Sequence, residues 1–353
     1  MKRLASDLPF KLSLLALSIP GLLASPAIQA AEEDMFFSEL PIVASVSRLP
    51  QRLADAPTSV TVIDREMIRS LPIRDLNDIF RLVPGFQTYP NNTEAARVTY
   101  HGLTDEEFSP RLQVLVDGRS MYSSAFRNGV NWAVIPVAIE DIERIEVVRG
   151  TNAVSYGSNA FLGVINIITV DPSLVQGFSV TANHGNQGIR DYSLRTGGKL
   201  GEAGNFRFTY RQQNDDGLKN QFDWIDSYTS QLFDLRADFA LNERDSLQVS
   251  AGKISAVTQR GRLRTPQLTE SNPTNPIRDF DQSNAYVQLL WRRIMSAGSE
   301  FSLRYAYSAD EGSEGFINLG NRPGPAPVAP YRYDPWGASG SLHEMEALHN
   351  LNL

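Results

Sequence analysis

The spacing of the hydrophobic positions changes near Pro172. Before it, residues 59–63 alternate as a strand, and Asp64 is placed to cap a helix over residues 65–70. After Asp75, apolar residues at i, i+3, i+4 and i+7 predict a second helix with one buried face. These residues are Leu76, Ile79, Phe80 and Val83.

Four further segments of this first part alternate as strands, and Asp117-Gly118 closes one of them as a turn. The mixture of strands and helices predicts a small α+β domain over residues 47–172. The four segments are residues 97–100, 113–116, 144–148 and 164–169.

From residue 173 onward, long segments of period two replace the helical pattern. One face of each segment is apolar and aromatic, and the other carries charges of both signs. A soluble β-sandwich and a transmembrane β-barrel both produce this alternation. The clearest segments are residues 206–211, 233–239, 247–251, 287–291 and 301–307.

The connections between these segments distinguish the two folds, because short and long connections alternate strictly. Outer-membrane barrels have short periplasmic turns and long extracellular loops, so we expect a barrel whose long segments face outside. The short turns are 201–204, 242–245 and 295–298, and the long segments are 212–229, 255–282 and 309–341.

The number of strands sets the size of such a barrel. Eight strands, the count that we infer from Phe178 onward, would close to a diameter of about 16 Å, and about 22 strands to about 44 Å. A domain of about 130 residues is about 36 Å across, so it does not fit into the smaller barrel. We therefore expect an α+β domain followed by the N-terminal strands of an antiparallel transmembrane β-barrel, apparently truncated. Expressed by itself, the chain should aggregate or be degraded.

The N-terminus has the features of a signal peptide over residues 1–30. Lys2 and Arg3 precede an apolar stretch over residues 12–23, and small residues lead to a cleavage site after Ala30. This stretch is too short to span a membrane as an anchor, so we expect export out of the cytoplasm.

Composition and charge narrow the chemistry. The 353 residues carry a net charge of -7, which argues against a nucleic-acid partner, and they include no cysteine for thiol catalysis or thiolate metal sites. His343 and His349 would lie about 20 Å apart along a strand, too far for a shared metal. Residues 150–157 lack the Gly-Lys-Ser/Thr ending of a phosphate-binding loop. We expect no enzyme activity, no metal and no resident cofactor.

Three segments together resemble the plug domain of TonB-dependent outer-membrane receptors: residues 40–45, residues 114–118 and residues 142–169. The resemblance implies a plug at residues 47–172, the first part of a barrel at residues 173–353, and a periplasmic N-terminal segment at residues 31–46. That segment contains a motif similar to the TonB box, which the TonB energy-coupling protein binds as an added β-strand. The alternative is an ordinary linker. The motif is Leu40, Pro41, Ile42, Val43, Ala44 and Ser45.

Arg144, Glu146 and Arg149 alternate with apolar residues on one predicted strand. This charged face is a candidate lock that bonds the plug to the polar inner side of the barrel, and the alternative is a solvated strand face.

Ligand contacts in such a receptor should come from plug loops and the long barrel loops. Aromatic and amide side chains with one arginine suit a bulky polar chelate, although packing against the barrel is an equally good account of any single residue. The candidates are Tyr89, Asn91, Asn92, Tyr122, Phe126, Arg127, Asn128 and Trp132.

The resemblance thus implies an importer in the outer membrane, in contact with its lipid and monomeric if complete. Its cargo would be a scarce chelate, such as a ferric siderophore, haem or cobalamin. The alternatives are a passive porin or adhesin with the same barrel pattern, and a non-functional truncated receptor fragment. A signalling receptor requires an extra domain before the motif, where only residues 31–39 stand.

Overall fold

The computed structural model describes eleven ranges of the chain, and the predicted signal peptide lies outside them. The described residues are 42–43, 51–91, 94–103, 111–126, 129–157, 159–217, 225–265, 268, 270–273, 275–318 and 330–351.

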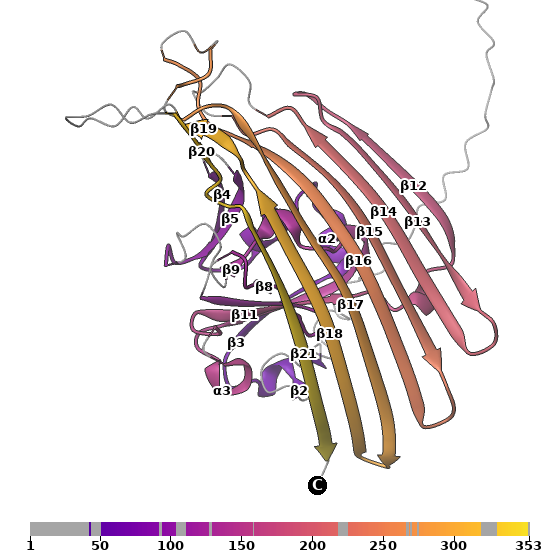
Figure 1. Cartoon of the computed structure of the whole chain (residues 1–353). Coiled ribbons are helices and arrows are strands. Elements are labelled where there is room, and N and C mark those ends of the chain that lie inside the picture. The colour runs from indigo at the N-terminus through magenta and orange to yellow at the C-terminus, as the bar shows by residue number, and fades with distance from the viewer. Residues whose placement is uncertain are drawn as a thin grey trace, which may run out of the picture. The chain divides into compact units, whose positions relative to one another are not determined.

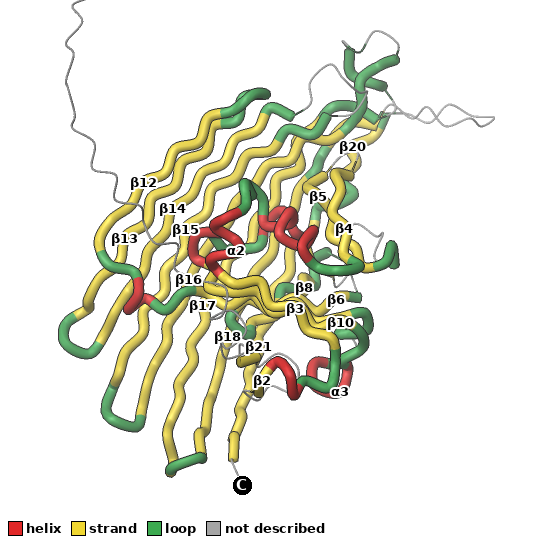
Figure 2. The backbone as a smooth tube through the Cα atoms, turned by 180° about the vertical axis from the view of Figure 1, so that it is seen from behind, coloured by secondary structure: helices red, strands yellow, loops and turns green. Residues whose placement is uncertain are grey.

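A five-stranded mixed sheet forms the centre of the first part, in the order β3-β10-β11-β6-β7 (Figure 2). β10 is antiparallel to both β3 and β11, and β11 is parallel to β6, so the predicted strands and the α+β class are confirmed. The bounds are β3 Ser59–Asp64, β6 Leu112–Val116, β7 Arg119–Ser120, β10 Ile142–Arg149 and β11 Gly163–Thr169.

The predicted turn at Asp117-Gly118 joins β6 to β7. Its two residues have φ values of 48° and 80°, the left-handed pair that a two-residue hairpin turn requires. Asp-Gly is a preferred sequence for this turn because both residues tolerate positive φ.

The first predicted helix is confirmed as α2, Arg65–Ser70, and the Asp64 carboxylate accepts a hydrogen bond from Met67 N at 2.7 Å. The second is a 3-10 helix, η2 Leu76–Leu82. Of the predicted apolar stripe, Ile79, Phe80 and Val83 are buried, and Leu76 is partly buried against the same core. Asp75 provides no side-chain cap for η2, since its carboxylate accepts from Gln213 of a distant strand at 3.4 Å. The hydrogen bond from Gln213 thus takes the place of a helix cap by Asp75.

Apolar side chains cover both faces of the five-stranded sheet. Ile145 and Ile167 belong to the larger cluster, which includes the buried residues of η2, and Val148 and Val164 belong to a smaller cluster on the other face. The remaining elements here are β1 Ile42–Val43, β2 Gln51–Arg52, η1 Leu53–Asp55, β4 Phe86–Asn91, β5 Glu94–Tyr100, β8 Tyr122–Ser123, β9 Gly129–Val130, η3 Trp132–Val134, η4 Ile139–Asp141, α3 Ala153–Tyr156 and η5 Pro172–Leu174.

The second part forms an eight-stranded antiparallel sheet in the order β12-β13-β14-β15-β16-β17-β18-β21, which confirms the predicted count (Figure 1). β12 and β21 are its edges, and within the described ranges they do not pair with each other. The bounds are β12 Gly177–His184, β13 Arg190–Leu200, β14 Gly204–Asp215, β15 Tyr228–Ala240, β16 Asp245–Arg260, β17 Arg278–Ser296, β18 Ser299–Ser313 and β21 Ala338–Leu351, with a separate hairpin of β19 Phe316–Asn318 and β20 Tyr331–Tyr333.

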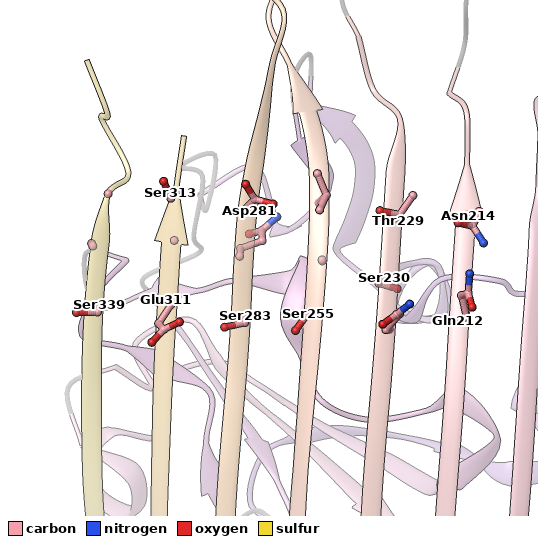
Figure 3. Close-up of a pocket in the computed structure, with 17 residues that line it drawn as sticks. Gln212, Asn214, Thr229, Ser230, Ser255, Asp281, Ser283, Glu311, Ser313 and Ser339 are labelled. Atoms are coloured by element: carbon pink, nitrogen blue, oxygen red, sulfur yellow. The ribbon is translucent and has the colours of Figure 1, made fainter. Parts of the chain in front are cut away.

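The strands are longer than predicted, so the three long segments are partly strand. β14 continues to Asp215 and β15 begins at Tyr228, within the segment predicted as a loop. In these extensions the outward positions are polar, among them Gln212, Thr229 and Ser255 (Figure 3). Because apolar and polar residues do not alternate clearly there, the sequence predicted a loop, whereas the structure shows that strand pairing continues.

The two faces of the large sheet differ in an unusual way. Phe233 and Leu235 on β15 are 48% and 42% exposed on the outward face, whereas Asp234 between them is 3% exposed because the five-stranded domain covers the inward face. The apolar face is therefore the exposed one.

Among the described helices, none is both long and apolar enough to cross a membrane.

Candidate functional site

The Asp117-Gly118 turn is a contact point between the five-stranded domain and the large sheet. The Asp117 carboxylate accepts hydrogen bonds from Thr169 N at 2.9 Å and Thr169 Oγ1 at 2.7 Å. From the large sheet, Gln288 Nε2 donates to Asp117 O at 3.0 Å, and Arg304 donates to Gly118 O. The turn thus places backbone carbonyls where strand side chains bind them.

A second contact is a buried ion network, formed by Asp141, Arg195, Arg207, Asp234 and Tyr286. Asp141 ends η4, and its Oδ1 lies 2.7 Å from Arg195 Nε and 3.4 Å from Arg207 Nε. Arg207 also donates to Asp234 Oδ2 at 2.8 Å, and Tyr286 donates to Asp234 Oδ1. The network links residues of four strands, β13, β14, β15 and β17, with one carboxylate of the other domain.

The network is almost fully buried, so the loss of any one member is costly. The Asp141 and Arg207 side chains are 0% and 1% exposed. Burial raises the pKa of the Asp141 carboxyl, against the opposing effect of the two guanidinium groups. Removing one partner of a buried pair leaves a charge without compensation and costs about 3–5 kcal/mol.

Arg119 of β7 adds a neighbouring contact. Its guanidinium lies 3.8 Å from the centroid of the Tyr286 ring, and its Nη1 donates to Ser308 Oγ at 3.3 Å. Burial lowers the pKa of Arg119 from its usual value. The tyrosine of the buried ion network therefore also contacts β7.

A third contact, the Arg74 ion pair, is more exposed. Arg74 Nε lies 2.6 Å from Asp191 Oδ2 and Arg74 Nη1 lies 2.5 Å from Asp215 Oδ2, on two adjacent strands. Arg211 Nη2 donates to Arg74 O at 2.8 Å. The Arg74 side chain is 22% exposed, whereas its partner Asp191 is 4% exposed, so water reaches one side of this contact.

A cavity of about 230 Å³ lies beside the Arg74 ion pair, between the two domains. Its polar end includes Arg74, Asp75 and Asp215, and its apolar lining includes Trp132 and Ile254. A larger hollow of about 770 Å³ lies on the outward side of the large sheet, where the polar strand ends of Figure 3 line it. The smaller cavity is in contact with both domains, as is a third space of about 620 Å³, whose lining includes Tyr122 of the five-stranded domain and Glu344 of β21.

The motif at residues 40–45 is described at two positions. Ile42 and Val43 form β1 and pair antiparallel with Arg52 and Gln51 of β2. β2 lies toward the short-turn end of the large sheet in both views (Figures 1 and 2). Outside the described residues lie Leu40, Pro41, Ala44 and Ser45.

The predicted lock residues do not share one face. Arg144 Nε donates to Glu146 Oε1 at 2.8 Å on the face that also carries Val148. The register of β10 continues without a shift from Ile145 to Arg149. Arg149 therefore lies on the same face as Ile145, opposite to Arg144 and Glu146. The idea of a single charged face was wrong, whereas a role of these residues in locking stays a prediction.

The three ligand candidates with described side chains are buried. Trp132 packs edge-on against Phe80 and lines the small cavity, and Phe126 packs edge-on against Phe280 of β17. Tyr122 is 8% exposed in the domain core, where burial raises the pKa of its hydroxyl. Tyr89 and Asn91 belong to β4, and the candidates outside the described residues are Asn92, Arg127 and Asn128.

The sequence analysis did not find the residues that join the domains. Arg207 and Asp234 were visible as inward-facing charges, but nothing local indicates that they pair with each other or with Asp141. The pairs are separated by dozens of residues along the chain, so only the fold brings them together.

Residues 52–164 match the family model of the TonB-dependent receptor plug domain. The plug and the strands that follow it are those of a TonB-dependent receptor. The chain is 32% identical over 205 residues to a vitamin B12 transporter of Vibrio vulnificus, a match covering 56% of this chain and 32% of that protein. An iron-regulated outer membrane virulence protein of Vibrio cholerae is 33% identical over 145 residues, covering 40% of this chain and 21% of that protein.

Solved receptors share the fold at low identity. The ferripyoverdine receptor of Pseudomonas aeruginosa superposes with a TM-score of 0.61 at 17% identity, over 81% of this chain and 38% of that chain. The ferric-catecholate import receptor Fiu of E. coli gives a TM-score of 0.63 at 13% identity, over 85% of this chain and 47% of that chain. The chain thus spans less than half the length of these relatives. The Vibrio cholerae and Pseudomonas aeruginosa relatives are named as outer-membrane proteins. We refer to the two parts of this chain as the plug and the large sheet.

Proposed function

We propose that this chain is part of an active outer-membrane importer of a scarce chelate, driven by a TonB protein that binds residues 40–45. A relative named as a vitamin B12 transporter and one named as iron-regulated support a chelate as cargo. Cobalamin is the first ligand to test, followed by ferric siderophores and haem.

The observation that carries this proposal is β1. Among the residues that the structure describes here, Ile42 and Val43 are extended and pair with two residues of β2. Such a short antiparallel pair is weak, so a partner strand can replace β2 with little loss of hydrogen bonding. A passive porin requires neither this strand nor a plug that is ion-paired to the large sheet.

The proposal predicts the effect of Ile42→Pro in the receptor that contains this chain. Proline removes a backbone donor from the strand, so uptake of labelled cobalamin or ferric siderophore by whole cells should be abolished while binding to the cells persists. Ile42→Val keeps the donor and the β-branched side chain and should transport normally. Normal uptake by the Ile42→Pro receptor would refute the assignment of the motif.

A further inference from the structure

A fourth pocket lies on the outward face of the large sheet, away from the plug. Leu289 of β17 is exposed on this face, and Trp291 and Arg293 share its parity because the register of β17 with β18 has no shift between Leu289 and Arg293. Phe301 of β18 is the strand partner of both Arg293 and His349 of β21. These side chains, from Trp291 onward, line a space of about 430 Å³ at the short-turn end of the sheet, the lower end in Figure 1.

One side of this outward pocket is apolar and aromatic. Trp291 packs edge-on against Phe301, with ring centroids 6.0 Å apart, and the Phe301 ring lies 6.4 Å from the His349 ring. The exposed side chains of Ile294 and Met295 complete this side. Aromatic girdles at the edge of the apolar band of a membrane barrel lie where acyl chains meet headgroups. The pocket is therefore at the level of the lipid headgroups.

The other side of the pocket is basic. Asn242 Oδ1 accepts hydrogen bonds from Arg244 N and Asp245 N, both at 2.9 Å, so the tight turn that carries Arg244 is fixed. Arg244 is exposed and forms no ion pair with any described residue. Arg293 Nε lies 3.8 Å from Asp245 Oδ1, which already accepts from Trp291 Nε1 at 3.1 Å. The described lining thus has two guanidinium groups and no carboxylate.

We propose that this outward pocket binds the headgroup of an anionic phospholipid, in the leaflet at the short-turn end of the sheet. Outer-membrane barrels have their short turns on the periplasmic side, so this is the periplasmic leaflet. A guanidinium group binds phosphate oxygens through parallel N–H donors, and Arg244 and Arg293 supply two such groups. The acyl chains then lie along the exposed apolar side chains of β17, among them Leu289. This inference does not depend on the proposed import function.

The two arginines separate this site from an ordinary aromatic girdle. Aromatic rings at a membrane interface contact any phospholipid, whatever the charge of its headgroup. A basic side chain near an anionic membrane surface changes binding about fivefold, which corresponds to about 1 kcal/mol. Preference for an anionic over a zwitterionic headgroup is therefore the property that identifies the site.

The test uses Trp291 as the reporter, because it lines the pocket. The receptor that contains this chain is purified in a neutral detergent and titrated with phosphatidylglycerol or phosphatidylethanolamine whose acyl chains are brominated. Bromine quenches the fluorescence of an indole that it contacts. The contribution of Trp291 is obtained by subtracting the signal of Trp291→Phe, titrated in the same way.

We expect phosphatidylglycerol to reach half-maximal quenching at a concentration at least tenfold lower than phosphatidylethanolamine. Arg244→Gln and Arg293→Gln should each raise the phosphatidylglycerol midpoint about fivefold and leave the phosphatidylethanolamine midpoint unchanged. Arg292→Gln is the matched control, because it removes the same charge one residue away on the opposite face of β17 and should change neither midpoint. Equal midpoints for the two lipids would overturn the inference, as would equal effects of Arg292→Gln and Arg293→Gln.

Inorganic phosphate distinguishes a lipid site from a site for a soluble anion. It is added to the phosphatidylglycerol titration at constant ionic strength. An unchanged midpoint supports a lipid that is held by its acyl chains as well as its headgroup. Displacement of the lipid by millimolar phosphate would show a site for soluble anions and overturn the assignment to a phospholipid.

Discussion

The buried ion network makes a quantitative prediction for Asp141→Ala. The side chains of Asp141, Arg207 and Asp234 are 0%, 1% and 3% exposed, so the two arginines that face Asp141 would lose a carboxylate without gaining water. Removing one member of a buried pair costs about 3–5 kcal/mol. Because Arg207 keeps Asp234 at 2.8 Å, we expect the low end of this range, about 3 kcal/mol.

The measurement is the free energy of unfolding of the receptor in urea, folded in detergent micelles and followed by tryptophan fluorescence. Arg264→Ala, which removes the ion pair with Glu270 at 54% and 69% exposure, is the exposed comparison and should cost about 1 kcal/mol or less. A double-mutant cycle of Asp141→Ala with Arg207→Met should give a coupling energy of about 1 kcal/mol or more. If Asp141→Ala does not fold, Asp141→Asn replaces it in the same cycle.

Two results would refute the reasoning about this network. One is a cost of Asp141→Ala no larger than that of Arg264→Ala, which would mean that burial does not determine the strength of these ion pairs. The other is additivity of the two substitutions in the cycle, which would mean that Asp141 and Arg207 do not interact across the interface.

Two further substitutions test the packing and the helix cap. A Cβ at Gly312 would lie 2.8 Å from Phe126 Cζ, so Gly312→Ala should lower the free energy of unfolding by about 1–3 kcal/mol in the same urea assay. Gly198→Ala is the control and should cost less, because its Cβ would have its nearest contact at 3.6 Å. Equal costs of the two substitutions would contradict the packing argument. Asp64→Ala removes the N-cap of α2 and should lower the free energy of unfolding by about 1 kcal/mol, whereas Asp64→Ser keeps a capping oxygen and should unfold like the unmodified chain. An unchanged urea midpoint for Asp64→Ala would contradict the role of Asp64 as a cap.

Local rules predicted the elements whose structure is determined locally. The Asp117-Gly118 turn, the cap at Asp64 and the strand count all follow from spacing and from residue type. The η2 segment differs because Asp75 bonds to Gln213 on another domain, and no local rule includes that partner.

The outward polar residues at the strand ends show a different limit. Alternation is visible only where one face is apolar. At Gln212 and Thr229 both faces are polar, although β14 and β15 continue there. Backbone pairing with neighbouring strands extends the sheet without any contribution from hydrophobic pattern. Strand ends of this kind can therefore be located only from the register of their neighbours.

The two faces of the large sheet resolve the choice between sandwich and membrane sheet that the alternation left open. A soluble sandwich buries its apolar face, but here Phe233 and Leu235 are exposed while Asp234 and Arg207 are buried against the plug. Such an arrangement is stable only if the outward face meets an apolar solvent and the inward charges find partners. The plug supplies those partners through Asp141, so the plug and the charged face of the sheet depend on each other.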